Sequence, residues 1–195
     1  MIPSRETHLV ELVDVQGAAI GQNTVERAHH APGQLHRAFS VLLVDADGRL
    51  LLQQRAAVKS RFPLRWANTC CGHPAPGESV AEAAARRLVE EMGVGAVALT
   101  EIGVHLYYAE DPSTGRVEYE YDHVLLGELP AERHLMPDPD EVADVRWSTP
   151  AELRTALKTD ARSYAPWLAG VIDRFFAHDP DPGRPDDAPE RSGDG

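Results

Sequence analysis

Short apolar runs separated by turn residues recur along the chain, and a few segments show the spacing of a helix. The clearest helix is predicted over residues 79–92, because a Ser-x-x-Glu capping box begins it and Gly93 follows it. Apolar residues recur there at intervals of three and four. The expected apolar stripe consists of Ala81, Ala84, Ala85, Leu88 and Met92.

Two more helices are predicted towards the C-terminus. Thr149 begins one of them, with a second capping box and Pro150 at the first helical position. Residues 163–177 are expected to form the last helix. Its predicted apolar face consists of Trp167, Leu168, Val171, Ile172 and Phe175.

Short apolar runs predict the strands, which are residues 10–15, 38–45, 49–54, 102–110, 117–126 and 142–147. Asp47 and Gly48 between the second and third runs predict a β-hairpin. Strands at both ends of the pattern with helices between them favour a mixed α/β sandwich.

Length and composition predict one domain with a tail. The chain has 195 residues, and we expect residues 5–178 to form a single domain. Residues 179–195 contain four prolines, six acidic residues and no large apolar residue. Such a segment cannot bury enough surface to offset its ordering entropy, so we predict a disordered tail.

The charge balance excludes several classes of partner. A formal net charge of −12 disfavours broad attraction to nucleic acid or anionic lipid, so an anionic ligand needs clustered cations or a metal ion. No apolar run is long enough for a membrane span. Two adjacent cysteines cannot form a disulfide framework, which favours a cytoplasmic protein. We expect a monomer, because the sequence pattern indicates no exposed apolar patch.

Alternating carboxylates mark the predicted strand 117–126. Side chains at every second position point the same way, so Glu118, Glu120 and Asp122 share one face. Carboxylates at this spacing suit a shared cation or an acid–base pair. The alternative is a solvated face with repelling charges, and the spacing leaves both open.

Histidine and cysteine add further candidates. Three of the nine histidines, His29, His36 and His73, would form with these carboxylates a nitrogen and oxygen set that suits Mn, Fe or Zn, and Mg less well. Spacing alone does not show that they converge. Cys71 precedes a predicted tight turn, where it is either a reactive thiol or, like Cys70, a small buried hydrophobe.

A basic loop is the best candidate for an anion site. It holds Arg55, Lys59, Arg61 and Arg65 within 11 residues, with no acidic residue between them. Arginine presents a planar fork to phosphate oxygens, and lysine presents a point charge. A solvated surface loop is the alternative.

Residues 72–94 fit the spacing of a Nudix box, a loop–helix–loop whose carboxylates hold Mg²⁺ against a diphosphate. The matching positions are Gly72, Glu78, Arg86, Glu90, Glu91 and Gly93. Arg87 stands where the box has a glutamate, one helical turn from Glu91. A cation cannot coordinate Mg²⁺ but can contact phosphate, so the change favours diphosphate binding without the usual hydrolytic metal set.

Four further motifs extend the resemblance from about residue 10 to residue 177. They are residues 35–40 (LHRAFS), 66–74 (WANTCCGHP), 118–120 (EYE) and 164–167 (YAPW). Together they resemble the type I isopentenyl-diphosphate Δ-isomerases, which are relatives with a Nudix fold. The resemblance implies a Nudix-like mixed β-sheet sandwich flanked by helices. It also implies an isomerase of isoprenoid biosynthesis that interconverts isopentenyl and dimethylallyl diphosphate through a tertiary carbocation.

The resemblance implies a role for individual residues. Cys71 and Glu120 would lie on opposite faces of the substrate, with Tyr107 hydrogen-bonding nearby. One divalent metal, Mn²⁺, Mg²⁺ or Zn²⁺, would be bound by His29, His36, His73, Glu118 and Glu120. Glu91 would help to hold a Mg²⁺ that is also bound to the substrate diphosphate. The substrate contacts would be Arg55, Lys59 and Arg87 at the diphosphate and Trp167 at the cationic intermediate.

Two positions depart from the family pattern. Val25 stands where the family usually has a diphosphate-binding lysine, and Arg27 is the nearest replacement. His30 lies beside His29, although the seven-residue gap to His36 favours His29 as the first ligand. The competing functions are a Nudix hydrolase acting on a nucleoside diphosphate derivative and a non-catalytic module that binds metal or diphosphate.

Overall fold

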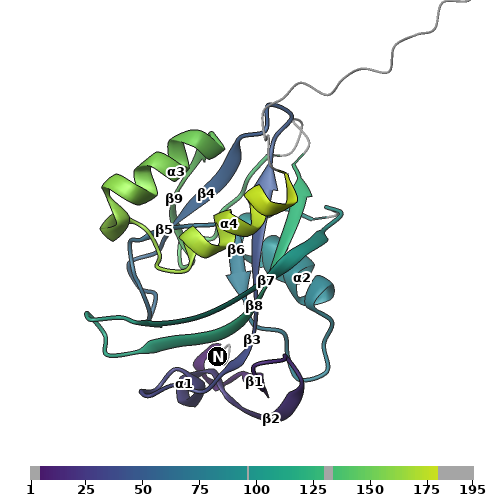
Figure 1. The fold of residues 1–195 in the computed structure, drawn as a ribbon, viewed down its shortest axis with the longest axis vertical. Coiled ribbons are helices and arrows are strands. Elements are labelled where there is room, and N and C mark those ends of the chain that lie inside the picture. Colours follow the sequence, from purple (N-terminus) through teal and green to yellow (C-terminus); the bar gives the residue numbers. More distant parts are fainter. Residues whose placement is uncertain (1–4, 96, 130–133, 180–195) are drawn as a thin grey trace, which may run out of the picture.

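A computed structural model describes residues 5–95, 97–129 and 134–179. The strands are β1 (Leu9–Val13), β2 (Ala19–Thr24), β3 (His36–Val44), β4 (Leu50–Arg55), β5 (Trp66–Ala67), β6 (Cys70–Gly72), β7 (Thr100–Glu110), β8 (Val117–Glu128) and β9 (Val142–Ser148). The helices are α1 (Val25–Ala28), α2 (Val80–Met92), α3 (Pro150–Thr159) and α4 (Leu168–His178), with 3₁₀ turns η1 (Arg5–Thr7) and η2 (Ala161–Ser163). The predicted mixed α/β class is confirmed (Figure 1).

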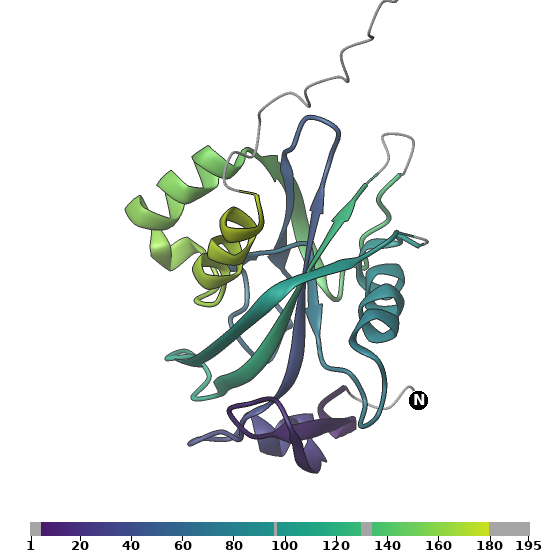
Figure 2. The same ribbon diagram turned by 45° about the vertical axis from the view of Figure 1, so that its right-hand side comes forward.

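Strand β3 lies at the centre of the mixed sheet. It runs parallel to β8 over nine residue pairs and antiparallel to β6 and β1. Strand β4 pairs instead with β9 and β5. The predicted turn between β3 and β4 is confirmed, with Gly48 at a φ of 72° that favours glycine. The two strands share only the pair Val44 and Leu50 and then diverge (Figure 2).

Helices cover both faces of the sheet. Helix α2 lies on one side and α3 and α4 lie on the other (Figure 2). Successive residues of β3 alternate between the two sides, so Leu42 packs in the cluster with Leu168 of α4 and Leu43 packs with Leu88 of α2. All four side chains are almost fully buried. This layering is the sandwich that the alternation of strands and helices predicts.

Helix α2 begins and ends where the sequence predicts. The Ser79 side chain accepts a hydrogen bond from the backbone of Glu82, and Gly93 ends the helix in the left-handed conformation. The predicted stripe is wrong at Ala81 and Ala85, which are exposed. The buried face instead continues through Ala83, Ala84, Arg87, Leu88, Glu91 and Met92. Its charged members are buried because they pair with each other, which a pattern of apolar residues cannot reveal.

The last helix starts later than predicted. Helix α4 begins at Leu168, because a proline at position 166 disfavours helical backbone before it and Tyr164 forms a bridge with Trp66 of β5. The predicted apolar residues of this segment are nevertheless all buried. No helix of the described ranges is long and apolar enough to cross a membrane. The predicted tail lies outside these ranges except for Asp179, so the domain boundaries stay a prediction. The cytoplasmic location and the monomeric state also stay predictions.

Candidate active site

Strand β8 carries the two predicted carboxylates on one buried face. Glu118 and Glu120 are 4% and 8% exposed, and Asp122 on the same face is fully buried. The register places Glu120 opposite His36 of β3 and opposite Tyr107 of β7. The alternative of a solvated face with repelling charges is therefore wrong.

Three histidines from three segments converge on these carboxylates. His29 follows α1, His36 begins β3, and His73 follows β6. Nε2 of His73 is 2.9 Å from Oε1 of Glu120, and Nε2 of His36 is 3.6 Å from the same oxygen. Nε2 of His29 is 2.8 Å from Oε2 of Glu118. The candidate ligand atoms all lie within 4.8 Å of one another, and we call these five residues the metal-ligand cluster.

The cluster has the chemistry of a metal site. Nδ1 of His29 and of His36 each donate to a backbone carbonyl at 2.7 Å, so Nε2 of both rings faces the cluster. Nε2 of His36 is buried and has no hydrogen-bond partner among the described residues, and Nε2 of His29 faces Oε2 of Glu118 at 2.8 Å without hydrogen-bond geometry. A divalent cation would satisfy all three atoms, and three imidazoles with two carboxylates suit Mn, Fe or Zn.

The electrostatics of the cluster favour a bound cation. Burial alone would lower the pKa of His29, but the Glu118 carboxylate raises it to about 9. Burial likewise opposes ionisation of Glu120, yet the three neighbouring histidines hold its pKa well below the usual range. Burial lowers the pKa of His73 to about 4. At neutral pH both carboxylates are therefore ionised and His73 is neutral, while His29 carries a second proton that a bound cation would displace.

The predicted basic loop supplies one support to this cluster. Nε of Arg61 donates to Oε1 of Glu118 at 2.9 Å, which leaves Oε2 facing the histidines. Nη1 of Arg61 is 3.0 Å from Oε1 of Glu6 in η1. The next residue, Phe62, has a φ of 45°, unusual for a side-chain-bearing residue, and its N–H donates to Asp111 at 2.7 Å. The position of Arg61 in the basic loop predicts a contact with an anionic ligand. Nothing in the sequence indicates that Arg61 donates to Glu118 of the metal-ligand cluster.

The two adjacent cysteines lie in different environments. Cys70 is fully buried in the core beneath α2, and Cys71 packs beside the core beneath α4. Sγ of Cys71 is 3.8 Å from Nη1 of Arg55. Burial raises the pKa of Cys71 to about 12, despite the opposing charge of Arg55. The two neighbouring side chains therefore lie on opposite faces of one strand.

Tyr107 and Trp167 complete this side of the site. The Tyr107 hydroxyl donates to Oε2 of Glu120 at 2.5 Å. Trp167 is buried, and its ring centre lies 6.1 Å from the ring centre of Tyr107. The Arg55 guanidinium lies 5.4 Å from the centre of the Trp167 ring. The remaining N–H groups of Arg55 bond to the backbone carbonyls of Arg61 and of the next residue. The structure thus brings these predicted residues together around Cys71 and Glu120.

The other predicted substrate contacts form a separate set of ion pairs. Arg87 and Glu91 lie one turn apart on α2 and form an ion pair, and Nε2 of Gln53 donates to Glu91 at 3.0 Å. Lys59 pairs with Glu141, which sequence analysis does not single out. Glu91 is not among the residues of the metal-ligand cluster. We call Arg5, Lys59, Arg87, Glu90, Glu91 and Glu141 the ion-pair network.

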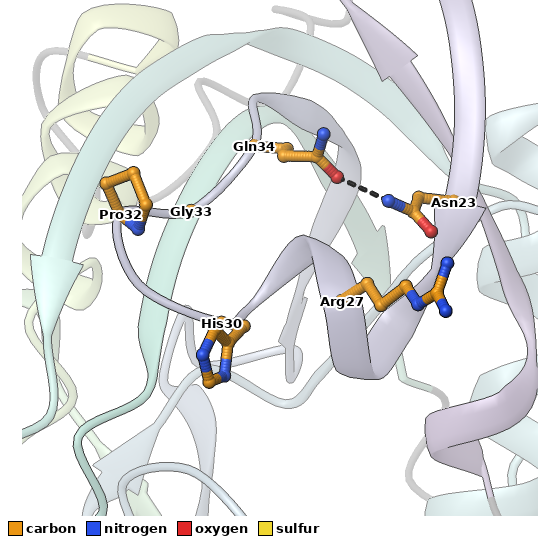
Figure 3. Close-up of a pocket in the computed structure, with 6 residues that line it drawn as sticks. All are labelled: Asn23, Arg27, His30, Pro32, Gly33 and Gln34. Carbon is orange, nitrogen blue, oxygen red and sulfur yellow. Dashed lines mark hydrogen bonds between the residues drawn. The ribbon is translucent and has the colours of Figure 1, made fainter.

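The departures at Val25 and His30 have clear structural outcomes. Val25 is buried in a small core with Val10 and Ala28, so it contributes no cation. His30 is exposed, whereas His29 is buried in the cluster. An open surface hollow is lined by Asn23, Arg27, His30, Pro32, Gly33 and Gln34 (Figure 3). Arg27 lines this hollow, and none of the other residues around it belongs to the predicted site.

Comparison with known proteins agrees with this geometry. The NUDIX domain model matches residues 34–169. A Nocardia farcinica protein named isopentenyl-diphosphate Delta-isomerase is 63% identical over 164 residues, which cover 84% of this chain and 92% of that protein. A Streptomyces coelicolor protein of the same name is 49% identical over 86% of this chain and 83% of its own length.

Solved structures support the fold. A crystal structure from Deinococcus radiodurans has a TM-score of 0.66 at 20% identity and covers 86% of this chain and 98% of its own. A MutT NUDIX hydrolase from Burkholderia pseudomallei has a TM-score of 0.56 at 20% identity, with 72% and 98% coverage. At such identities the likeness concerns the fold alone. Sequence identity and the matched domain together show that this chain belongs to the Nudix family and, within it, to the isopentenyl-diphosphate Delta-isomerases.

Proposed function

We propose that this chain interconverts isopentenyl diphosphate and dimethylallyl diphosphate. The observation that carries the proposal is the buried Glu120 carboxylate, which is held by three histidines and Tyr107 in a chain 63% identical to a protein of that name. Strands β6 and β8 both pair with β3, so Cys71 and Glu120 approach the site from the two sides of one strand. This arrangement suits proton transfer at two ends of a small allylic group.

The reaction needs one proton added and one removed. Protonation of the terminal alkene carbon leaves a positive charge on the neighbouring tertiary carbon, and loss of a proton from the adjacent methylene forms the new double bond. Burial raises the pKa of Cys71 to about 12, so the thiol holds a proton at neutral pH, whereas Glu120 is ionised. Which of the two groups gives the proton and which takes it depends on the direction of the reaction.

The surroundings of these two groups fit a cationic intermediate. The Tyr107 hydroxyl orients Glu120, and the buried Trp167 ring offers a face that stabilises positive charge by ~0.5–2 kcal/mol. A dry cavity protects such an intermediate from capture by water. In the structure the Arg55 guanidinium lies near the Trp167 ring. A substrate bound beside this ring would carry a diphosphate, and Arg55 would form an ion pair with it.

The metal-ligand cluster would hold one divalent metal through His29, His36, His73, Glu118 and Glu120. Such a metal supplies a fixed positive charge that orients the Glu120 carboxylate and tunes its pKa. Glu91 would hold a Mg²⁺ shared with the substrate diphosphate, and Lys59 and Arg87 would contact its oxygens. Arg87 replaces a carboxylate of the hydrolytic box, which favours retention of the diphosphate over its hydrolysis.

A product assay tests the proposal. The purified chain is incubated with isopentenyl diphosphate, Mg²⁺ and Mn²⁺, and both dimethylallyl diphosphate and released phosphate are followed. We expect dimethylallyl diphosphate without phosphate release. Phosphate alone would identify a hydrolase, and the absence of both products would identify a binding module. Cys71→Ala should abolish isomerisation, and Cys70→Ala is the matched control because Cys70 lies on the opposite side of the sheet.

A further inference from the structure

The ion-pair network contains one cation to which the proposed reaction gives no role. Arg5 lies in η1, and its Nε is 2.8 Å from Oε1 of Glu141. Nη2 of Arg5 is 3.3 Å from Oε2 of Glu90. The N-terminal turn therefore reaches the same carboxylate as Lys59 and Arg87.

Glu141 lies at the centre of these three cations. Its Oε1 faces Arg5 and, at 3.4 Å, Nη2 of Arg87, and its Oε2 pairs with Lys59. The Glu141 residue is 6% exposed. A carboxylate surrounded by three cations makes the contacts that a phosphate group would make with the same side chains. Glu141 and an incoming diphosphate therefore compete for Lys59 and Arg87.

This competition has an energetic consequence. When Lys59 and Arg87 turn towards a diphosphate, Glu141 loses two of its three partners. A buried carboxylate without a partner is costly, and this cost weakens the binding of the diphosphate. Of the three described cations that pair with Glu141, Arg5 is the one that the proposed substrate contacts do not use.

We propose that Arg5 is a positioning residue for substrate binding: it keeps Glu141 paired while the diphosphate takes Lys59 and Arg87. The inference rests on the proposed function, since that function assigns these two cations to the diphosphate. It predicts that the N-terminal turn strengthens substrate binding without contributing to the chemical step.

Kinetics of Arg5→Ala test this role. We expect KM for isopentenyl diphosphate to rise about fivefold and kcat to stay within about twofold, because the partly exposed Arg5 loses its ion pairs with Glu141 and Glu90. Arg5→Lys should restore most of the affinity. Arg49→Ala is the matched control: its side chain is 46% exposed against 43% for Arg5, and it pairs with two aspartates at the β3–β4 turn. It should leave both constants unchanged.

A double-mutant cycle separates positioning from direct contact. In the Glu141→Gln background, position 141 carries no charge that needs a partner. We therefore expect the added Arg5→Ala change to leave KM unaltered. An equal rise of KM in both backgrounds would show that Arg5 contacts the diphosphate itself and would overturn the proposal. An unchanged KM for Arg5→Ala in the otherwise native chain would overturn it as well.

Binding of inorganic pyrophosphate with Mg²⁺, followed by calorimetry, gives a readout that does not depend on turnover. We expect the dissociation constant to rise about fivefold in Arg5→Ala, as for KM. If the native chain binds pyrophosphate but forms no dimethylallyl diphosphate, the proposed function fails while the role of Arg5 is still measured. Equal affinities of the native and variant chains, or no binding to either, would contradict the role of Arg5.

Discussion

The metal-ligand cluster and the ion-pair network both bury several charges, but they differ in what they leave unpaired. In the cluster, Nε2 of His29, Nε2 of His36 and Oε2 of Glu118 have no hydrogen-bond partner among the described residues. In the network, three cations face three carboxylates, and Arg87 alone contacts Glu90, Glu91 and Glu141. The cluster is therefore completed by adding a cation, whereas the network accepts an anion only by exchanging partners.

Substitution of Glu120 tests the first half of this comparison and has the largest expected effect. Glu120→Gln removes the charge that the three histidines share, so we expect kcat to fall by about 10³-fold or more. Affinity for Mn²⁺ should fall in the same variant, measured from the free Mn²⁺ signal by electron paramagnetic resonance. Glu128→Gln, at the exposed end of the same strand, is the control. Full activity in Glu120→Gln would remove Glu120 from the proposed chemistry.

Substitution of Arg87 tests the network. Arg87→Ala removes the cationic partner of the buried Glu91 and leaves it with the neutral side chains of Gln53 and Cys70, so we expect the free energy of unfolding to fall by about 3 kcal/mol. Arg86→Ala, one residue away on the exposed face of α2, should cost about 0.5 kcal/mol or less. Urea denaturation at neutral pH measures both. Equal losses in the two variants would show that the network does not depend on the buried cation.

Addition of metal tests whether the cluster is incomplete. At a Mn²⁺ concentration about 100 times its dissociation constant, binding stabilises the folded chain by about 2.7 kcal/mol, which raises Tm by about 5–10 °C for a domain of this size. His36→Ala should remove most of this shift, and His178→Ala, at the exposed end of α4, should retain it. Thermal unfolding with and without Mn²⁺ decides this. A native chain whose Tm ignores Mn²⁺ would contradict the metal site.

Local geometry explains why part of the site is legible in the sequence. The period of two along a strand places Glu118 and Glu120 on one face whatever the strand packs against. Turn chemistry at Gly48 is equally local and is confirmed. The stripe of α2 is different, because Ala81 and Ala85 are small enough for either face and the buried charges of the helix depend on partners elsewhere.

Contacts between distant segments explain what remains hidden. His36 and His73 come together because β3 pairs with β6, and His29 joins them because its backbone carbonyl accepts a hydrogen bond from Val117 of β8 at 3.0 Å. Strand order is not written in the spacing of the histidines. The residue types suggest a candidate set, and the family resemblance is what assigns it to one metal. Glu141 illustrates the limit, since it follows Asp138 and Asp140 in an acidic run and nothing marks it as the partner of Lys59.

Acid stability sharpens the comparison with the smallest expected effect. Burial alone would raise the pKa of Glu141, but Lys59 and then Arg87 lower it below the usual value of 4.5. A carboxyl group whose pKa is lower in the folded than in the unfolded chain stabilises the fold at pH values above its pKa in the unfolded chain. This stabilisation is lost as the pH falls through its pKa in the folded chain.

Glu141→Gln should therefore lower the free energy of unfolding more at about pH 7 than at about pH 3, because the stabilisation by the charge declines as the pH falls below 4.5. Urea denaturation of the native and variant chains at the two pH values gives the difference directly. A cost that is the same at both would mean that the charge of Glu141 contributes nothing to the fold. The carboxylates that stabilise the network would then be Glu90 and Glu91. The exchange of partners at Glu141, by which the network differs from the metal-ligand cluster, would have no energetic basis.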